Sequence, residues 1–239
     1  MALSEIPETN SCRICGSTDT VKSHLFPRAM HRDIRKDAKH VIGVTPGRER
    51  VSYLQSGEWS DRILCATHEA QLGDADDYAI RFCRTFLDRA QPIGNGQAVK
   101  IANPQPRKLI VFAHAVVWRH AAAHRYLERS LGPYMERIHA ALFEAGVLLE
   151  LLVVDPGHQH RGERTLLGVC PDVTKTQGVR CVRFDIGGLG FILKTDQRPF
   201  PYPLRLFTAD SDPTTILMMD PVEITQNRFF LKAARVRRT

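Results

Sequence analysis

The stretches Cys12-Arg13-Ile14-Cys15 and Cys65-Ala66-Thr67-His68 decide how the N-terminal part of this chain folds. Each stretch holds two metal-binding side chains separated by two residues, so each pair can occupy one edge of a tetrahedron from a tight turn. The four side chains predict a closed, structural zinc site of the Cys3His type. The alternative is a chance spacing of buried cysteines, but two matched pairs are more specific than one.

The composition indicates a globular protein with a sizeable core. The chain has 239 residues, of which 43% are hydrophobic, enough for one large domain or two small ones. The longest apolar run, 147–154, is interrupted by Glu150 and is too short to span a bilayer. The first residues lack the basic flank and apolar segment of a signal peptide. We therefore expect a cytoplasmic protein without a membrane partner, whose six cysteines are metal ligands or free thiols.

The pattern along the chain predicts two α+β parts joined by a linker. Apolar residues at helical spacing predict a helix over 69–89, which begins at the second ligand pair. A zinc ion held between a knuckle and a helix N-terminus is the layout of a treble-clef finger. Several Pro, Gly and Asn residues follow the helix, so we assign 1–91 to a zinc-binding domain, 92–107 to a linker and 108–239 to a second domain.

The second domain is expected to mix helices with an antiparallel sheet. Helical patterns cover 108–131 and 133–145, on either side of Gly132-Pro133. Gly187-Gly188-Leu189-Gly190 joins two strand patterns and reads as a turn, not as a phosphate-binding loop. A capping box at 220–223 predicts a basic C-terminal helix to about residue 236. The strands are expected over 147–154, 164–169, 179–186, 191–194, 204–207 and 215–219.

The segment between the ligand pairs supplies a hypothesis about chemistry. Ser23-His24-Leu25-Phe26-Pro27 contains a His-x-x-Pro sequence, and Leu64-Cys65 begins the second pair. This order resembles the zinc-containing HNH, or ββα-metal, endonucleases. With Trp118-Arg119 downstream, it also resembles a group of uncharacterised bacterial HNH-like proteins with S-H-x-x-P and L-C-x-x-[CH]-E motifs. The resemblance implies a ββα-metal-like zinc domain and hydrolysis of nucleic-acid phosphodiesters by a divalent metal ion.

The resemblance assigns roles to individual residues. His24 matches the general base, and Glu69, directly after the second zinc pair, matches a ligand of the catalytic metal. Ser23 stands where an Asp or His ligand is expected, and no Asn precedes Cys65. A carboxylate suits hard cations such as Mg²⁺ or Mn²⁺, with Ni²⁺ as another choice. Further candidate ligands for this catalytic metal are Asp61, Asp76 and Asp77.

These observations lead to one functional hypothesis with two alternatives. The net charge of +7 favours an acidic partner, and we expect nucleic acid, DNA in preference to RNA. The first hypothesis is therefore an HNH-like endonuclease, with a link to phage defence or mobile elements implied by the resemblance alone. The alternatives are a catalytically degenerate zinc finger that binds nucleic acid, and a protein-interaction module. The oligomeric state stays open. The expected phosphate contacts come from a basic segment with Arg28, Arg32, Arg35, Lys36 and Lys39, and from the C-terminal helix.

Two other groups of residues have simpler interpretations. His120 and His124, with His114 nearby, have a spacing that suits a metal, but the Glu of a zincin motif is missing. We interpret them as part of a helix face at the surface or at the edge of the core. The remaining cysteines are expected to be small buried apolar residues: Cys83, Cys170 and Cys181.

Overall fold

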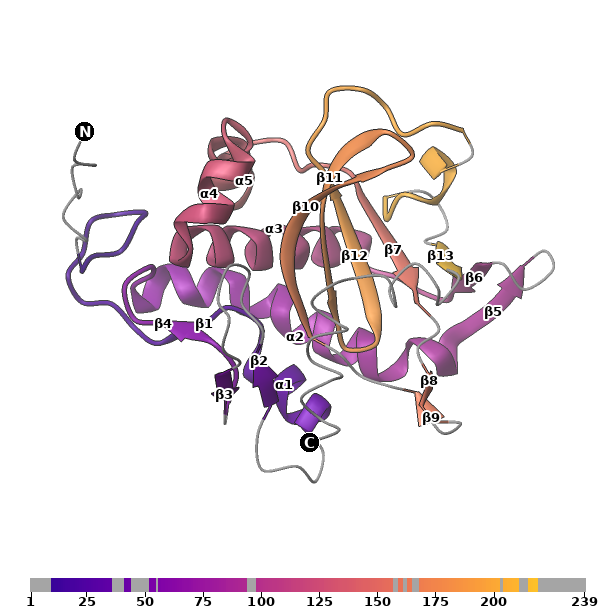
Figure 1. The fold of residues 1–239 in the computed structure, drawn as a ribbon, viewed down its shortest axis with the longest axis horizontal. Coiled ribbons are helices and arrows are strands. Elements are labelled where there is room, and N and C mark those ends of the chain that lie inside the picture. Colours follow the sequence, from indigo (N-terminus) through magenta and orange to yellow (C-terminus); the bar gives the residue numbers. More distant parts are fainter. Residues whose placement is uncertain are drawn as a thin grey trace.

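The computed structural model describes an α+β fold (Figure 1). The described residues are 10–35, 41–43, 52–54, 56–93, 98–156, 159–160, 163–164, 168–202, 204–210 and 215–218. The predicted C-terminal helix, and the basic residues Lys36 and Lys39, lie outside them.

The N-terminal part consists of short strands, one short helix and one long helix. β1 and β4 pair antiparallel, with Ser23 opposite Ser60 and His24 opposite Trp59. β2 and β3 form a second antiparallel pair. In chain order the elements are β1 (Ser23–His24), α1 (Arg28–Arg35), β2 (Val41–Gly43), β3 (Ser52–Leu54), β4 (Trp59–Ser60) and α2 (Ala66–Arg89).

Helix α2 confirms the helix that the sequence predicts and starts three residues earlier. Its buried face has the expected helical spacing, and Glu69 in its first turn and Arg89 in its last complement the helix dipole. The short helix α1 is not among the predicted elements, because its eight mostly polar residues bury only Met30 and His31.

A seven-stranded sheet forms the centre of the rest of the fold, in the order β10-β11-β12-β7-β13-β6-β5. All pairs are antiparallel except β13 with β7. β13 is the last strand along the described chain, yet it lies between β6 and β7. The strands are β5 (Ala90–Ile93), β6 (Ala98–Ile101), β7 (Leu151–Asp155), β10 (Val169–Thr176), β11 (Val179–Ile186), β12 (Leu189–Lys194) and β13 (Thr215–Met218).

The helices cover one face of this sheet. In Figure 1, α3 (Pro106–Ala123) runs behind the strands beside α2, and α4 (Arg125–Leu131) and α5 (Tyr134–Phe143) stand at its end. Alternate residues of β12 face opposite ways: Phe191 joins the large core under the helices, and Ile192 joins a smaller cluster with Phe200. Both faces of the strand are apolar because each face packs against a hydrophobic cluster.

The β11–β12 hairpin connects the sheet to α2. Gly187 and Gly188 both have positive φ, as a two-residue hairpin turn requires, which agrees with the predicted turn. A Cβ at Gly187 would lie 2.7 Å from the Cβ of Cys83, so the hairpin tip touches α2 closely. One hydrophobic core therefore contains side chains from both predicted domains, and the domain boundaries themselves stay a prediction.

Several local predictions were wrong. Strands β5 and β6 were not predicted, because a hairpin can hold Pro92 at the edge of a sheet. They and the start of α3 overlap residues 92–107, whose assignment as a linker between domains stays a prediction. Residues 204–207 form a 3-10 helix and not a strand. The helix expected over 108–131 is interrupted at His124, whose backbone is extended. Two further short strands, β8 (Gln159–His160) and β9 (Glu163–Arg164), pair with each other.

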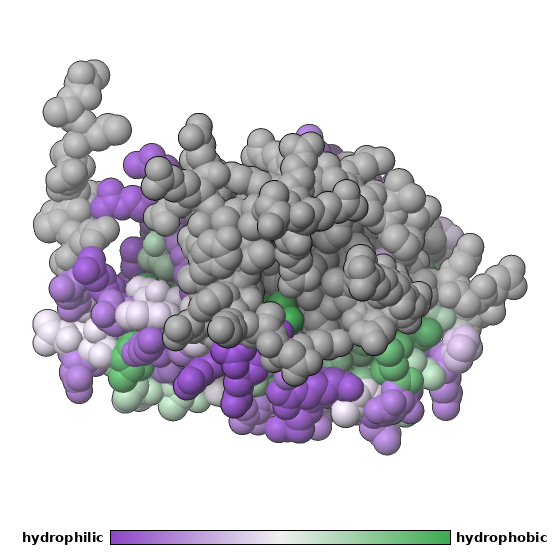
Figure 2. Space-filling view, turned by 60° about the horizontal axis from the view of Figure 1, so that its bottom comes forward, coloured by the Kyte–Doolittle hydropathy of each residue, from purple (hydrophilic) through white to green (hydrophobic). Residues whose placement is uncertain are grey.

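None of the helices within the described part of the chain combines the length and hydrophobicity needed to cross a membrane. On the face shown in Figure 2, the visible described residues are mainly hydrophilic, and hydrophobic residues form separate small patches.

Candidate metal centre and adjoining polar network

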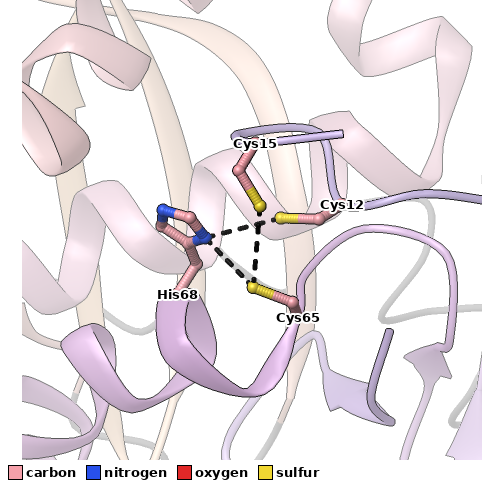
Figure 3. A group of neighbouring side chains, drawn as sticks. All are labelled: Cys12, Cys15, Cys65 and His68. Carbon is pink, nitrogen blue, oxygen red and sulfur yellow. Dashed lines mark hydrogen bonds between the residues drawn. The ribbon is translucent and has the colours of Figure 1, made fainter. Parts of the chain in front are cut away.

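Four side chains converge at the N-terminus of α2 with the spacing of a tetrahedral metal site (Figure 3). The donor atoms of Cys12, Cys15, Cys65 and His68 all lie within 4.8 Å of one another. Zinc–sulfur bonds of about 2.3 Å and a zinc–nitrogen bond of about 2.0 Å give tetrahedral edges of about 3.8 Å (S–S) and about 3.5 Å (S–N). The observed edges are 3.9 Å for Cys15 Sγ–Cys65 Sγ, 3.6 Å for Cys12 Sγ–His68 Nδ1 and 3.2 Å for Cys65 Sγ–His68 Nδ1.

The backbone explains why these residues meet. The knuckle turns tightly because Gly16 has a positive φ and donates its N–H to the Cys12 carbonyl at 2.9 Å. Arg13 donates to the Ile63 carbonyl at 3.0 Å, which fixes the knuckle against the segment before Cys65. The second pair spans the first turn of α2. Two elements far apart in sequence thus each present one ligand pair.

The chemistry of the donors also fits a cation. All three cysteines are free thiols, and none is within disulfide distance of another. Burial raises the pKa of Cys12, but backbone N–H donors of the knuckle and of Cys65 outweigh burial and lower the pKa to about 6. The Ser17 N–H lowers the pKa of Cys15. Desolvation and the neighbouring thiols of Cys12 and Cys65 outweigh this bond, so the pKa of Cys15 is raised overall. The Cys12 thiolate forms readily, but three thiolates so close together would repel one another. A bound zinc ion would neutralise this repulsion and stabilise all three thiolates of the site.

A buried polar network adjoins this centre through Glu69. Ser23, which is fully buried, donates a hydrogen bond to Glu69 Oε2 at 2.7 Å. Glu69 Oε1 accepts a bond from Arg119 Nη2 at 3.2 Å. Arg119 Nη1 also contacts both carboxylate oxygens of Asp76, at 2.9 and 3.2 Å. Burial raises the pKa of Asp76, and the bonds from Arg119 oppose that shift. Strand β1 and helices α2 and α3 are therefore joined by one ionic network.

His24 stands beside this network but is not part of it. Its Nε2 is buried and has no hydrogen-bond partner among the described residues. Burial lowers the pKa of His24, and the positive charges of Lys22 and Arg28 lower it further, whereas Glu69 opposes the shift. The lowered pKa favours the neutral imidazole, and Glu69 and Arg119 both lie close enough to act on it.

The other predicted site residues are dispersed. Asp61 is exposed, with its carboxylate 3.8 Å from Arg62, and Asp77 is exposed on α2. Of the predicted phosphate contacts, Arg28 and Arg32 are exposed on α1 and Arg35 is partly buried. The structure thus brings Ser23, His24, Glu69 and Asp76 together, and leaves Asp61 and Asp77 at the surface.

Two features of the site escaped the sequence analysis. Arg119 appeared only as part of a motif, although it is the single charged residue between Lys108 and the end of α3, and it is 1% exposed. A lone arginine in an apolar helix signals a buried ion pair. The second feature is that His31, in α1, is buried together with His120.

Comparison with known proteins adds no assignment. A scan against protein-family models, a search of curated proteins and a search of solved structures each found no match.

Proposed function

We propose that this protein is an HNH-like, metal-dependent endonuclease, a hydrolase of nucleic-acid phosphodiesters, and that its zinc-stapled part is a treble-clef, ββα-metal domain. The observation that carries the proposal is the position of Glu69. It directly follows the zinc-site residue His68 and is bonded to Ser23, the neighbour of His24. A general base and a carboxylate ligand therefore occupy adjoining positions on β1 and α2.

In this proposal His24 accepts the proton of the attacking water. A neutral imidazole is the form that a general base needs, and burial favours this form. Glu69 would bind a divalent cation, Mg²⁺, Mn²⁺ or Ni²⁺, which when bound stabilises negative charge on the scissile phosphate and the leaving oxygen. Ser23 and Arg119 fix the two carboxylate oxygens of Glu69 in place. Asp61 and Asp77 are exposed at the surface. Each would become a ligand of this cation only if its side chain adopted another conformation.

Nucleic acid, DNA in preference to RNA, is the proposed partner. Helix α1 begins four residues after His24 and presents the exposed side chains of Arg28 and Arg32. Such residues would contact the phosphate backbone close to the base and position the strand for cleavage. The link to phage defence or mobile elements rests on the resemblance to HNH proteins.

A second candidate function, nucleic-acid binding without catalysis, is favoured by one specific observation. Arg119 already pairs with Glu69 and Asp76, two partly buried carboxylates of α2. A fixed guanidinium at this place competes electrostatically with a divalent cation. If it prevents metal binding, the zinc-stapled part acts as a binding domain, and a protein partner in place of nucleic acid is the third possibility.

Cleavage assays separate these candidates. Purified protein is incubated with single- and double-stranded DNA and with RNA, with Mg²⁺, Mn²⁺ or Ni²⁺. The proposal expects divalent-dependent cleavage that His24→Ala lowers by a factor of about 10² to 10⁴. Glu69→Gln should raise the concentration of divalent ion needed for half-maximal activity. His139→Gln, at a histidine of α5 that pairs with Glu144 and is not a member of this network, is the control. Retention of nucleic acid without cleavage would support the second candidate.

A further inference from the structure

A group of histidines and one carboxylate lies where α1 and the turn before β4 meet the end of α3. The group consists of His31, Glu58, His120 and His124, and none of these residues belongs to the cysteine centre or to the Ser23–Glu69–Arg119 network. The ring of Phe26 packs against two of the histidines, with centroid distances of 5.9 Å to His31 and 4.6 Å to His120.

Glu58 contacts one histidine of the group directly. Its Oε1 is 3.1 Å from His124 Nε2. The His31 ring rests directly on Gly57, because a Cβ there would lie 2.0 Å from His31 Cδ2 and 2.2 Å from Nε2. His31 therefore stands beside the residue that precedes Glu58. The carboxylate is also close enough to influence the pKa values of both His31 and His120.

The buried histidines have unused nitrogen atoms. His120 is 1% exposed, and its Nδ1 bonds to the Val116 carbonyl at 2.8 Å, whereas its Nε2 has no partner among the described residues. A metal-binding histidine is commonly oriented in this way, with one ring N–H donated to a backbone carbonyl and the other nitrogen left for the metal. His31 is 6% exposed, and neither of its nitrogens has a partner in the described part of the chain. Leaving three buried polar atoms unpaired is costly unless they have a ligand.

We propose that Glu58, His120 and His124, with His31 as a fourth donor, form a second metal site that takes a divalent transition ion. Three imidazoles and one carboxylate suit Zn²⁺, Co²⁺ or Ni²⁺ better than Mg²⁺. Such an ion would join α1 and the β4 turn to α3, and it would give a partner to His120 Nε2 and to one ring nitrogen of His31.

The present side-chain positions fit this proposal in part. The His124–Glu58 distance of 3.1 Å is close to the edge of about 3.3 Å that nitrogen and oxygen ligands form on zinc. The rings of His120 and His124 are 6.4 Å apart between centroids, wider than the separation of about 5 Å for two imidazoles on one zinc ion. Among the described residues only the cysteine centre has its donor atoms already gathered, so metal binding here requires the side chains of this group to rotate toward one another. Glu58 is 34% and His124 20% exposed, so an ion can enter from solvent at these two residues.

Metal titration of the full chain tests the site. The protein, with its cysteine centre filled with zinc, is titrated with Co²⁺ alone and then with Zn²⁺ alone, and bound metal is counted after gel filtration. We expect one additional equivalent, whose Co²⁺ spectrum lacks sulfur-to-metal charge transfer. His124→Gln and Glu58→Gln should each weaken its binding by at least about tenfold, since loss of a ligand should cost no less than loss of an outer-shell partner.

Two control variants keep the result specific. His139 and Glu144 form a surface pair of the same kind, 3.5 Å apart, so His139→Gln should leave the equivalent unchanged. Glu69→Gln removes a ligand of the proposed nuclease metal and should leave the additional equivalent at the histidine group unchanged. The two proposals can therefore fail independently of each other. Because Glu58 and His124 are partly exposed, their variants should fold and retain the first zinc ion. Absence of an additional equivalent in the wild type, or one that both variants retain at full affinity, would overturn the proposal.

Discussion

Ser23 and Glu69, 46 positions apart in the sequence, are joined by a hydrogen bond of 2.7 Å from a buried hydroxyl to a carboxylate oxygen. Ser23 occupies the position where the HNH resemblance implies an acidic or imidazole metal ligand. In this chain the hydroxyl orients the neighbouring carboxylate. A residue that departs from the family pattern thus acquires a definite structural role.

Replacing Ser23 with Asp should make stability depend on divalent metal. A carboxylate at 23 would face Glu69 at hydrogen-bond distance, so the two negative charges repel when no metal is present. We expect the melting temperature of Ser23→Asp to fall below that of the wild type in metal-free buffer and to recover with Mn²⁺. Ser23→Asn, neutral and of similar size, should not respond to Mn²⁺. Equal melting temperatures for Ser23→Asp with and without Mn²⁺ would contradict this prediction.

The cysteine centre should contain one structural zinc ion per chain. Structural zinc contributes about 10–16 kcal/mol in isolated fingers, and of the residues in the short strands β1 and β4 only Ser23 is buried. Cys65→Ser should lose the zinc and expose residues 10–90 to limited proteolysis, as measured by metal analysis and mass spectrometry. Cys83→Ser, outside the cluster, is the matched control and should retain zinc. A Cys65→Ser protein as protease-resistant as the wild type would refute the structural role.

Removing the Arg119 side-chain charge should destabilise the fold strongly. Arg119→Met leaves Glu69 and Asp76 without their shared cation, and loss of one partner of a buried pair costs about 3–5 kcal/mol. The exposed pair Arg84–Asp33 provides a comparison, since Arg84→Met should cost less than about 1 kcal/mol. Urea unfolding measures both. The prediction fails if the two variants lose the same free energy of unfolding.

The basic surface of α1 should bind nucleic acid with a steep dependence on salt. Each phosphate contact adds about 0.9 to the slope of log K against log salt for duplex DNA. The double variant with Arg28→Ala and Arg32→Ala should therefore lower the slope by about 2 and weaken binding to all sequences. Arg129→Ala, at an exposed arginine of α4, should change neither quantity. Fluorescence anisotropy over a range of salt concentrations provides the test, and an unchanged slope would mean that α1 is not the contact surface.

Acid should destabilise the protein in part through His114. Burial lowers its pKa from 6.5 to about 4, although its Nδ1 bonds to the Ile110 carbonyl and its Nε2 accepts the Leu149 N–H. Between these pH values the unfolded chain binds one more proton, so the free energy of unfolding falls as pH decreases from about 6.5 to about 4. His114→Gln should fall less steeply across this window, as measured by urea unfolding with zinc present. An identical pH dependence for both proteins would exclude His114 as a source.

Local patterns predicted much of the fold but not its long-range contacts. The periodicity of Leu72 through Phe86 predicted α2, and the prediction for β11 matches the strand residue for residue. The β5–β6 hairpin was missed because Pro92 and the following glycines resemble a linker, and its strand character comes from pairing with β13, more than a hundred residues later. Strand 204–207 was predicted from its apolar residues, which instead pack from a 3-10 helix onto the smaller cluster.

The same division applies to the candidate sites. The cysteine pairs could be predicted because ligand spacing is local, and the structure brings all four residues together as expected. The roles of Arg119 and His31 depend on which elements meet in space: α3 with α2, and α1 with the end of α3. Arg119 nevertheless carried a usable signal, because an isolated charge in an apolar helix needs a partner. His31 carried none, since it lies in a short basic segment of mostly polar residues.

The central position of β13 has a consequence for synthesis of the protein. While the ribosome is still adding residues before 215, the nascent chain can form the β5–β6 hairpin and the four strands β7, β12, β11 and β10. In the described sheet these two groups of strands are hydrogen-bonded to each other only through β13, which is still missing at this stage. β6 and β7 then each present an open edge, and open edges are where chains pair wrongly with one another. The strand containing Ile216 closes both edges at once, when nearly all of the chain has been translated. A stalled or truncated product therefore lacks the single strand that unites its sheet, and aggregation of the incomplete chain should start at these two edges.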